Sequence, residues 1–110
     1  MTANLPAIPN LALFQITIDF HGDFDLAELE KILNKSIRWI KCMPNSWLVL
    51  SSSHADRWWA RLHPLLGDTD TMLICEVDSE TIQCWIQKWK IDWMTEAREQ
   101  IRKTYPGQPP

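Results

Sequence analysis

Glycine is scarce in this chain, with three residues among 110. This composition excludes collagen-like and glycine-rich low-complexity sequences, and the sequence has no glycine-rich phosphate-binding loop. No apolar run approaches the ~20 residues needed to cross a bilayer. The first ten residues show neither the basic start nor the apolar stretch of a secretory signal. We therefore expect a cytoplasmic protein with no membrane partner.

Basic residues and paired cysteines are also few. The chain has 11 Lys and Arg against 14 Asp and Glu, a net charge of −3 that disfavours a protein binding nucleic acid over its whole surface. Cys42, Cys75 and Cys84 are odd in number, and no two lie at the CxxC spacing. We expect buried thiols in a reducing compartment, without disulfides or a zinc site.

Tryptophan, by contrast, is abundant, with seven residues in 12.9 kDa. A chain of this length accommodates a single domain, and its 45% hydrophobic content supports a core. We expect one domain over residues 1–110, with a core at about 11–77, an extension at about 78–104 and a frayed tail at 105–110.

The first half of the chain predicts a strand followed by a helix. Residues 13–20 alternate apolar and polar side chains, the period of a strand with one buried face. Asp25 is the expected N-cap of the helix, with Glu28 three residues later and Phe24 placed to contact Leu29. Apolar residues at helical spacing then continue to Leu33.

The next segments predict two strands, a helix and a further strand. Residues 37–51 form two strands joined at Pro44 and Asn45, a turn dipeptide. Ser53 is the expected N-cap of a helix that ends or kinks near Pro64. Residues 71–77 are apolar on both faces, which predicts a central or doubly covered strand.

The summed order, β-α-β-β-α-β, is that of the ferredoxin-like α+β fold. Two helices on one sheet face would bury one shared apolar core: Phe14, Ile16, Ile18, Leu29, Ile32, Trp58 and Leu62. After this order, residues 81–86 predict a short fifth strand and residues 90–103 a further amphipathic helix.

Four stretches carry a resemblance to a known family: residues 13–19, Trp39 followed by residues 46–49, residues 70–77, and Trp85 followed by Trp93. In these stretches the chain resembles the small bacterial proteins labelled SinR-like, which are unrelated to the helix-turn-helix regulator of that label. They are similar in outline to the Cas-two-like family of CRISPR adaptation, which are ferredoxin-like homodimers. The resemblance spans about residues 13–94.

The resemblance implies a role for Asp19. In the Cas-two-like family an aspartate ends the first strand and, with its mate across the dimer, helps to hold a divalent metal for phosphodiester cleavage. Asp19 matches that position. The basic residues usual after that strand are replaced here by residues 22–25, Gly-Asp-Phe-Asp, which departs from the nucleic-acid-binding pattern.

The residues around Asp19 also predict a metal site by themselves. Asp19, His21 and Asp23 alternate, so an extended strand would direct them to one side, where they suit a hard ion such as Mg²⁺. Asp19 and Asp23 would then be ligands, with His21 assisting Asp19 in catalysis. The structural interpretation of the same residues is a helix cap at Asp25, a loop at Asp23 and a solvent-facing Asp19. No other cofactor is expected.

The second sheet face predicts a homodimer. We expect it to carry Trp39 or Ile40, together with Trp47, Met72 and Ile74, apolar side chains that need a cover. Either the extension or a second copy would supply that cover. The expected interface therefore consists of Trp39, Trp47, Met72, Ile74, Trp85, Trp89 and Trp93.

The extension also offers a local basic patch. Five cations are interleaved with its three tryptophans and would suit single-stranded nucleic acid: Lys88, Lys90, Arg98, Arg102 and Lys103. Asp92, Glu96 and Glu99 lie in the same segment, so a packed helix is the simpler interpretation.

The function predicted from these features is that of a cytoplasmic homodimer of the SinR-like/Cas-two-like type in a nucleic-acid or defence-related setting. Its catalytic form is a weak metal-dependent nuclease using Asp19 and His21. The alternatives are a non-catalytic interaction module, such as an antitoxin-like regulator that binds another protein, and a small-ligand-binding domain.

Overall fold

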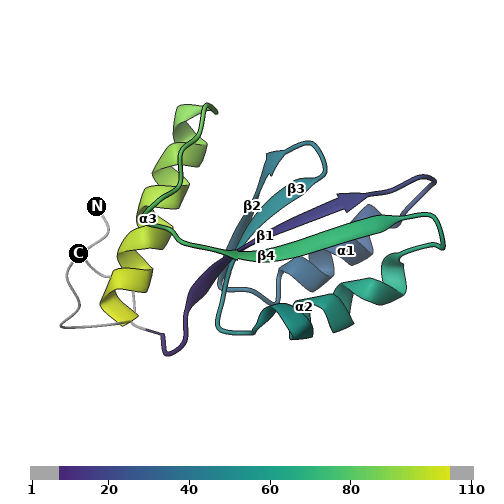
Figure 1. Ribbon diagram of the computed structural model, residues 1–110, viewed down its shortest axis with the longest axis horizontal. Helices are drawn as coiled ribbons and strands as arrows, with labels where there is room; N and C mark the ends of the chain where they lie inside the picture. Colours follow the sequence, from purple (N-terminus) through teal and green to yellow (C-terminus); the bar gives the residue numbers. More distant parts are fainter. Residues whose placement is uncertain (1–7, 105–110) are drawn as a thin grey trace.

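The computed structural model describes residues 8–104, which form an α+β domain with a four-stranded antiparallel sheet and three α-helices (Figure 1). The expected frayed tail at 105–110 lies outside the described residues. None of the described helices is long and apolar enough to cross a membrane. The elements are β1 (Ala12–Asp19), α1 (Leu26–Leu33), β2 (Arg38–Met43), β3 (Ser46–Ser51), α2 (Ala55–Leu62), the 3₁₀ turn η1 (His63–Leu65), β4 (Thr71–Val77) and α3 (Lys88–Thr104).

The sheet has the strand order β2-β3-β1-β4, and every neighbouring pair is antiparallel. The turn between β2 and β3 contains Asn45 at a φ of 64°, a left-handed conformation that asparagine tolerates. β4 lies at an edge, so the prediction of a central or doubly covered strand is wrong. Met72 and Ile74 pack on the helical side, whereas Leu73 on the opposite face is 64% exposed.

Helices α1 and α2 cover one face of the sheet (Figure 1). Phe14, Ile16 and Ile18 of β1 pack there in one cluster with residues of both helices, including Leu29 and Trp58. The shared core predicted from the two periodicities is thus confirmed. Burial of these side chains is the main stabilising contribution to this layer.

The two helices begin differently. The Asp25 carboxylate accepts a hydrogen bond of 3.0 Å from the Glu28 N–H, which confirms the predicted cap of α1. The N-cap of α2 is His54, without a side-chain hydrogen bond, so the prediction of Ser53 is wrong by one residue. The Ser53 hydroxyl instead accepts a 3.3 Å hydrogen bond from Arg61.

Helix α3 covers part of the opposite face. Met94 and Ala97 are buried in a second cluster with Leu13 and Leu50 of the sheet. Figure 1 shows α3 apart from α1 and α2, at the end of the sheet where β1 begins. An Arg38–Glu96 ion pair of 2.8 Å also joins β2 to this helix. The predicted extension therefore acts as a sheet cover at that end.

The predicted fifth strand is wrong, because residues 81–86 form no strand. The segment crosses from the end of β4 to the start of α3, after a turn in which the Thr81 N–H donates to the Asp78 carbonyl at 3.1 Å. Ile82 and Ile86 pack against the second core. These two side chains contact the second core from an irregular segment, not from a strand.

Of the apolar residues expected on the open face, all except Ile40 lie on the helical face instead. In the strand register Ile16 faces Trp47 on one side and Ile74 on the other, so all three share the face covered by α1 and α2. Met72 faces Ile18 and Trp39 faces Val49, with the same result. Of the two alternatives at the start of β2, it is Ile40 that faces α3.

Candidate functional site

The polar cluster at the end of β1 contains part of the predicted site. The His21 Nε2 lies 3.1 Å from the Asp19 Oδ2. Asp70, which the sequence did not indicate, joins them: its carboxylate accepts hydrogen bonds from the His21 N–H at 2.8 Å and the Gly67 N–H at 2.7 Å. These two backbone donors lower the pKa of Asp70, the His21 bond having the larger effect.

Asp70 has a structural role that the strand pairing explains. Asp19 faces Thr71 in the register, so the residue before Thr71 lies beside the loop that follows β1. In the sequence, a glycine followed three residues later by an aspartate, directly before β4, is the pattern of a turn. The structure has this turn, because the Asp70 N–H also donates to the Gly67 carbonyl at 3.1 Å. Asp70 therefore ties the loop after β1 to the turn before β4.

The remaining acids do not extend this cluster into a metal site within one chain. β1 ends at Asp19, so the alternation of an extended strand does not continue to Asp23, which is exposed in the following loop. Asp25 serves as the cap of α1. Within residues 8–104, no three His, Cys, Asp or Glu side chains gather in a group that could hold a metal ion.

The Asp19–His21 pair is open to solvent, with side-chain exposures of 60% and 52%. Water screens such a pair strongly, so its mutual attraction is weak. Mg²⁺ requires several oxygen donors in octahedral geometry. The Asp19–His21 pair alone does not supply them. The residues of a single described chain thus do not fit a magnesium centre.

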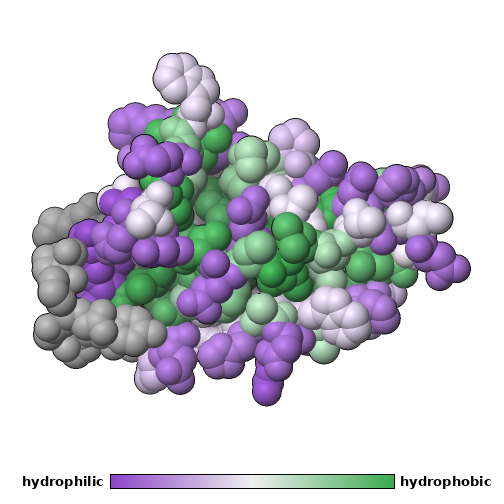
Figure 2. Space-filling model, viewed as in Figure 1, coloured by the Kyte–Doolittle hydropathy of each residue, from purple (hydrophilic) through white to green (hydrophobic). Residues whose placement is uncertain are grey.

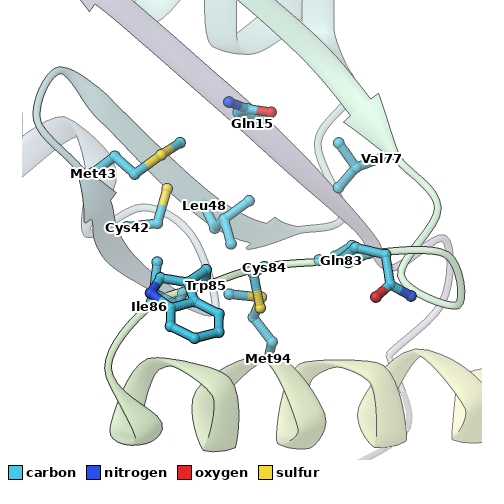
Figure 3. A pocket seen from close by; sticks show the side chains of 11 residues that line it. Gln15, Cys42, Met43, Leu48, Val77, Gln83, Cys84, Trp85, Ile86 and Met94 are labelled. Atoms are coloured by element: carbon cyan, nitrogen blue, oxygen red, sulfur yellow. The ribbon is translucent and has the colours of Figure 1, made fainter.

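A pocket of about 300 Å³ lies on the opposite face of the sheet, away from the Asp19–His21 pair and between the sheet, the irregular segment and α3 (Figure 3). Its walls include Gln15 and Leu48 from the sheet, Met94 from α3, and both Cys84 and Trp85. No charged side chain contributes to this lining within the described part of the chain. The pocket is therefore suited to an uncharged, mainly apolar group.

Sulfur-bearing side chains are concentrated in this pocket: Cys42, Met43, Cys84 and Met94. Burial raises the pKa of the Cys42 thiol, which keeps it protonated and uncharged at neutral pH. The expectation of three buried thiols is correct for Cys42 and wrong for Cys75 and Cys84, which are exposed. All three cysteines are free.

The three tryptophans of the extension have different surroundings. Trp93 packs against the second core, with the Arg38 guanidinium 5.6 Å from its ring centre. Trp89 is 59% exposed and lies 5.5 Å from the Lys90 ammonium. Trp85 is 99% exposed.

Most cations of the expected basic patch make contacts within the chain. Lys90 donates to the Cys42 carbonyl at 3.2 Å, and Arg98 donates to the Ser79 carbonyl at 2.9 Å. Arg102 forms ion pairs with Glu80 and Glu99 at 2.6 and 3.1 Å. These side chains secure α3 to the sheet and to the segment that precedes it.

Comparison of the chain with protein-family models, with curated proteins and with solved structures gives no match.

Proposed function

We propose that the chain is a cytoplasmic homodimer of the SinR-like/Cas-two-like type, with a ferredoxin-like fold, that acts through assembly rather than through catalysis. The strand order β2-β3-β1-β4, the antiparallel pairing of all neighbours and the placement of α1 and α2 on one face support that fold. The nucleic-acid or defence-related setting follows from the resemblance of residues 13–94 alone.

One observation carries the proposal: apolar side chains remain exposed where α3 leaves the sheet uncovered. Leu73 is 64% exposed, Met43 is 48% exposed and Trp85 is 99% exposed. Leu73 shares its face with Val77 by strand alternation, and Val77, Met43 and Trp85 all line the pocket. We call Met43, Leu73 and Trp85 the open-face surface. Figure 2 shows apolar side chains exposed over β4 and beside α3.

A second copy of the chain is the proposed partner. Clustered exposed apolar side chains mark interaction surfaces, and a two-fold dimer buries one such surface against itself. Nucleic acid is a poorer occupant, because the open-face surface carries no cation and Lys90, Arg98 and Arg102 are engaged within the chain. The other partner that the sequence suggested, a different protein, would use the same surface.

Sedimentation velocity over a dilution series in the micromolar range tests this function. We expect a reversible monomer–dimer equilibrium, and Leu73→Asp is expected to shift it toward monomer because a charge is then placed in the apolar contact. Glu76→Asp, which replaces an exposed residue of the same strand without changing charge, is the matched control. A monomer at all concentrations would refute the proposal, and tight binding of single-stranded DNA or RNA by that monomer at low salt would point to nucleic acid as the partner instead.

The nuclease hypothesis keeps one supporting observation, the Asp19–His21 pair at the end of β1. Since residues 8–104 of one chain supply no complete ligand set, a metal site there would require carboxylates from a second copy. Incubation of DNA and RNA with Mg²⁺ tests this hypothesis, using Asp19→Ala and, as the matched control, Glu76→Ala at an exposed acid outside the predicted site. Cleavage that is lost with Asp19→Ala and kept with Glu76→Ala would establish catalysis; we expect no cleavage by the unaltered protein.

A further inference from the structure

Trp85 is the most exposed large apolar side chain of the described residues, at 99%. It lies in the irregular segment between β4 and α3, just before the helix begins. An indole ring left in water gives up the favourable transfer of a large apolar surface. Packing within one chain therefore does not account for a tryptophan at this position.

The pocket beside Trp85 has the complementary properties. Its walls include Leu48, Ile82, Ile86 and Met94, and its volume is about 300 Å³. Trp85 is itself a lining residue, drawn next to Ile86 in Figure 3, and its 99% exposure places it at the rim. A charged occupant would lose its hydration without gaining an opposite charge, so the pocket favours an uncharged apolar group.

We propose that, in the homodimer, Trp85 of each copy inserts into the pocket of the other copy. This inference rests on the proposed dimeric function and adds its anchoring contact. In a two-fold interface, if Trp85 of one copy meets the pocket of its partner, the reverse contact is required by symmetry. Because Trp85 and the pocket adjoin one another, a single two-fold axis beside the rim satisfies both contacts.

The chemistry of the pocket suits an indole ring. The sulfurs of Cys42, Cys84 and Met94 lie in its walls, and sulfur makes favourable contacts with aromatic rings. Gln15 and Gln83 also line it, and a glutamine side-chain oxygen can accept the indole N–H. The pocket thus offers partners for both the apolar ring and its one polar atom.

A second copy fits these observations better than a small ligand does. The apolar surface extends beyond the rim to Met43 and Leu73, which are 48% and 64% exposed. A small molecule inside the pocket would leave Leu73 in water, because Leu73 is not part of the lining. A protein surface that carries Trp85 covers the pocket and its surroundings together.

Trp85→Ala is the direct test. Tryptophans are frequent anchors of protein interfaces, and this change removes two of them from each dimer. We expect the dimer dissociation constant to rise by roughly a hundredfold or more. Trp59→Ala is the matched control, since Trp59 is 52% exposed on α2 and is expected to leave the constant unchanged.

A complementation test examines the reciprocal contact. Cys84→Phe adds bulk to the pocket from an exposed position, so its effect on folding is small. Each variant alone is expected to dimerise poorly: Trp85→Ala lacks the anchor, and Cys84→Phe lacks the space for it. When the two are mixed, Trp85 of the Cys84→Phe chain can enter the open pocket of the Trp85→Ala chain, which recovers one of the two contacts. Sedimentation velocity is therefore expected to show more dimer in the mixture than in either variant alone, and less than in the unaltered protein.

The outcomes separate this inference from the proposed function. If the unaltered chain is monomeric at all micromolar concentrations, both fail. If it dimerises and Trp85→Ala dimerises equally well, or the mixture of variants restores nothing, the Trp85 contact is refuted and the homodimer stands. Free indole is the probe for the rival small-ligand site: it is expected to compete with dimer formation, and indole binding that leaves the dimer unchanged would refute the inference.

Discussion

At the scale of single residues, side chains adjacent in the sequence differ strongly in burial. Trp58 is fully buried beneath the sheet, with the Arg61 guanidinium 4.7 Å from its ring centre. Trp59, the next residue, is half exposed and stacks on His63 at 4.4 Å. A helix turns about 100° per residue, so adjacent side chains cannot both face the same core. Aromatic identity alone therefore does not indicate burial.

Trp58→Ala is expected to destabilise the domain by about 3–5 kcal/mol, because it removes a large buried ring and leaves a cavity. Trp59→Ala is expected to cost less than about 1 kcal/mol, since much of that ring already contacts water. Urea unfolding of the two variants measures both losses. Similar losses for the two would contradict the burial assigned to them.

Asp70→Asn tests the loop connection at the end of β1. Backbone N–H donors from His21 and Gly67 lower the pKa of Asp70, so the ionised carboxylate stabilises the folded state. That contribution is complete above the ordinary carboxyl pKa of about 4 and is lost as the pH falls through the lowered value. The variant should therefore be less stable than the unaltered protein at neutral pH, and the difference should shrink in acid.

Urea midpoints measured across this pH range give the comparison. Asp68→Asn, an exposed residue of the same loop, is the matched control and is expected to show no such pH-dependent difference. A difference between the Asp70 variant and the unaltered protein that persists at low pH would contradict the assigned role.

At the scale of elements, local chemistry explains where helices start and stop. α1 begins where the Asp25 carboxylate accepts the Glu28 N–H, and α2 gives way to a 3₁₀ turn at His63–Leu65 that contains Pro64. Both features follow from residue chemistry over a few positions. Elements whose signals are this local are predictable from sequence.

Asp25→Ala is expected to cost about 1 kcal/mol of stability, because one of the first N–H groups of α1 loses its partner. Asp23→Ala is expected to change stability little, since Asp23 is an exposed loop residue. Thermal and urea unfolding of the pair provide the test. A larger loss from Asp23→Ala, or a Mg²⁺-dependent stabilisation that either variant removes, would instead favour a metal role for these acids.

The attachment of α3 depends on its buried side chains. Met94 is 6% exposed in the second core, so Met94→Ala is expected to cost about 2–5 kcal/mol of packing free energy. Amide hydrogen exchange should show α3 opening more often, while α1 amides keep most of their protection. Ile91→Ala, at a residue 39% exposed on the same helix, is expected to have a much smaller effect.

At the scale of the whole molecule, the limits of sequence reasoning lie in the sheet. The positions of the strands in the 11–77 core follow from alternation in the first strand, the Pro44–Asn45 turn between the next two and the apolar run of the last. Their order and register depend on contacts distant in sequence. We expected Trp47, Met72 and Ile74 on the open face, but their strands have the opposite orientation and these side chains lie in the helical core. Alternate residues of a strand point to opposite faces, so an error of one position exchanges the two faces. The same reasoning missed Asp70, which meets His21 only because β1 and β4 are paired.

Of the open-face surface, the sequence indicated Trp85 but neither Met43 nor Leu73. Leu73 looks like a core residue in an apolar strand, and its exposure results from the edge position of β4 together with the limited reach of α3. Trp85 belongs both to the interface first expected and to the uncovered residues, whereas Met43 and Leu73 take the place of residues that lie in the helical core. We therefore expect the chain to dimerise through Met43, Leu73 and Trp85.

The most direct test is the mass of the unaltered protein in sedimentation equilibrium over a micromolar dilution series. We predict a mass that approaches twice the 12.9 kDa of one chain at the highest concentrations and falls toward 12.9 kDa on dilution. A mass of 12.9 kDa at every concentration would contradict it.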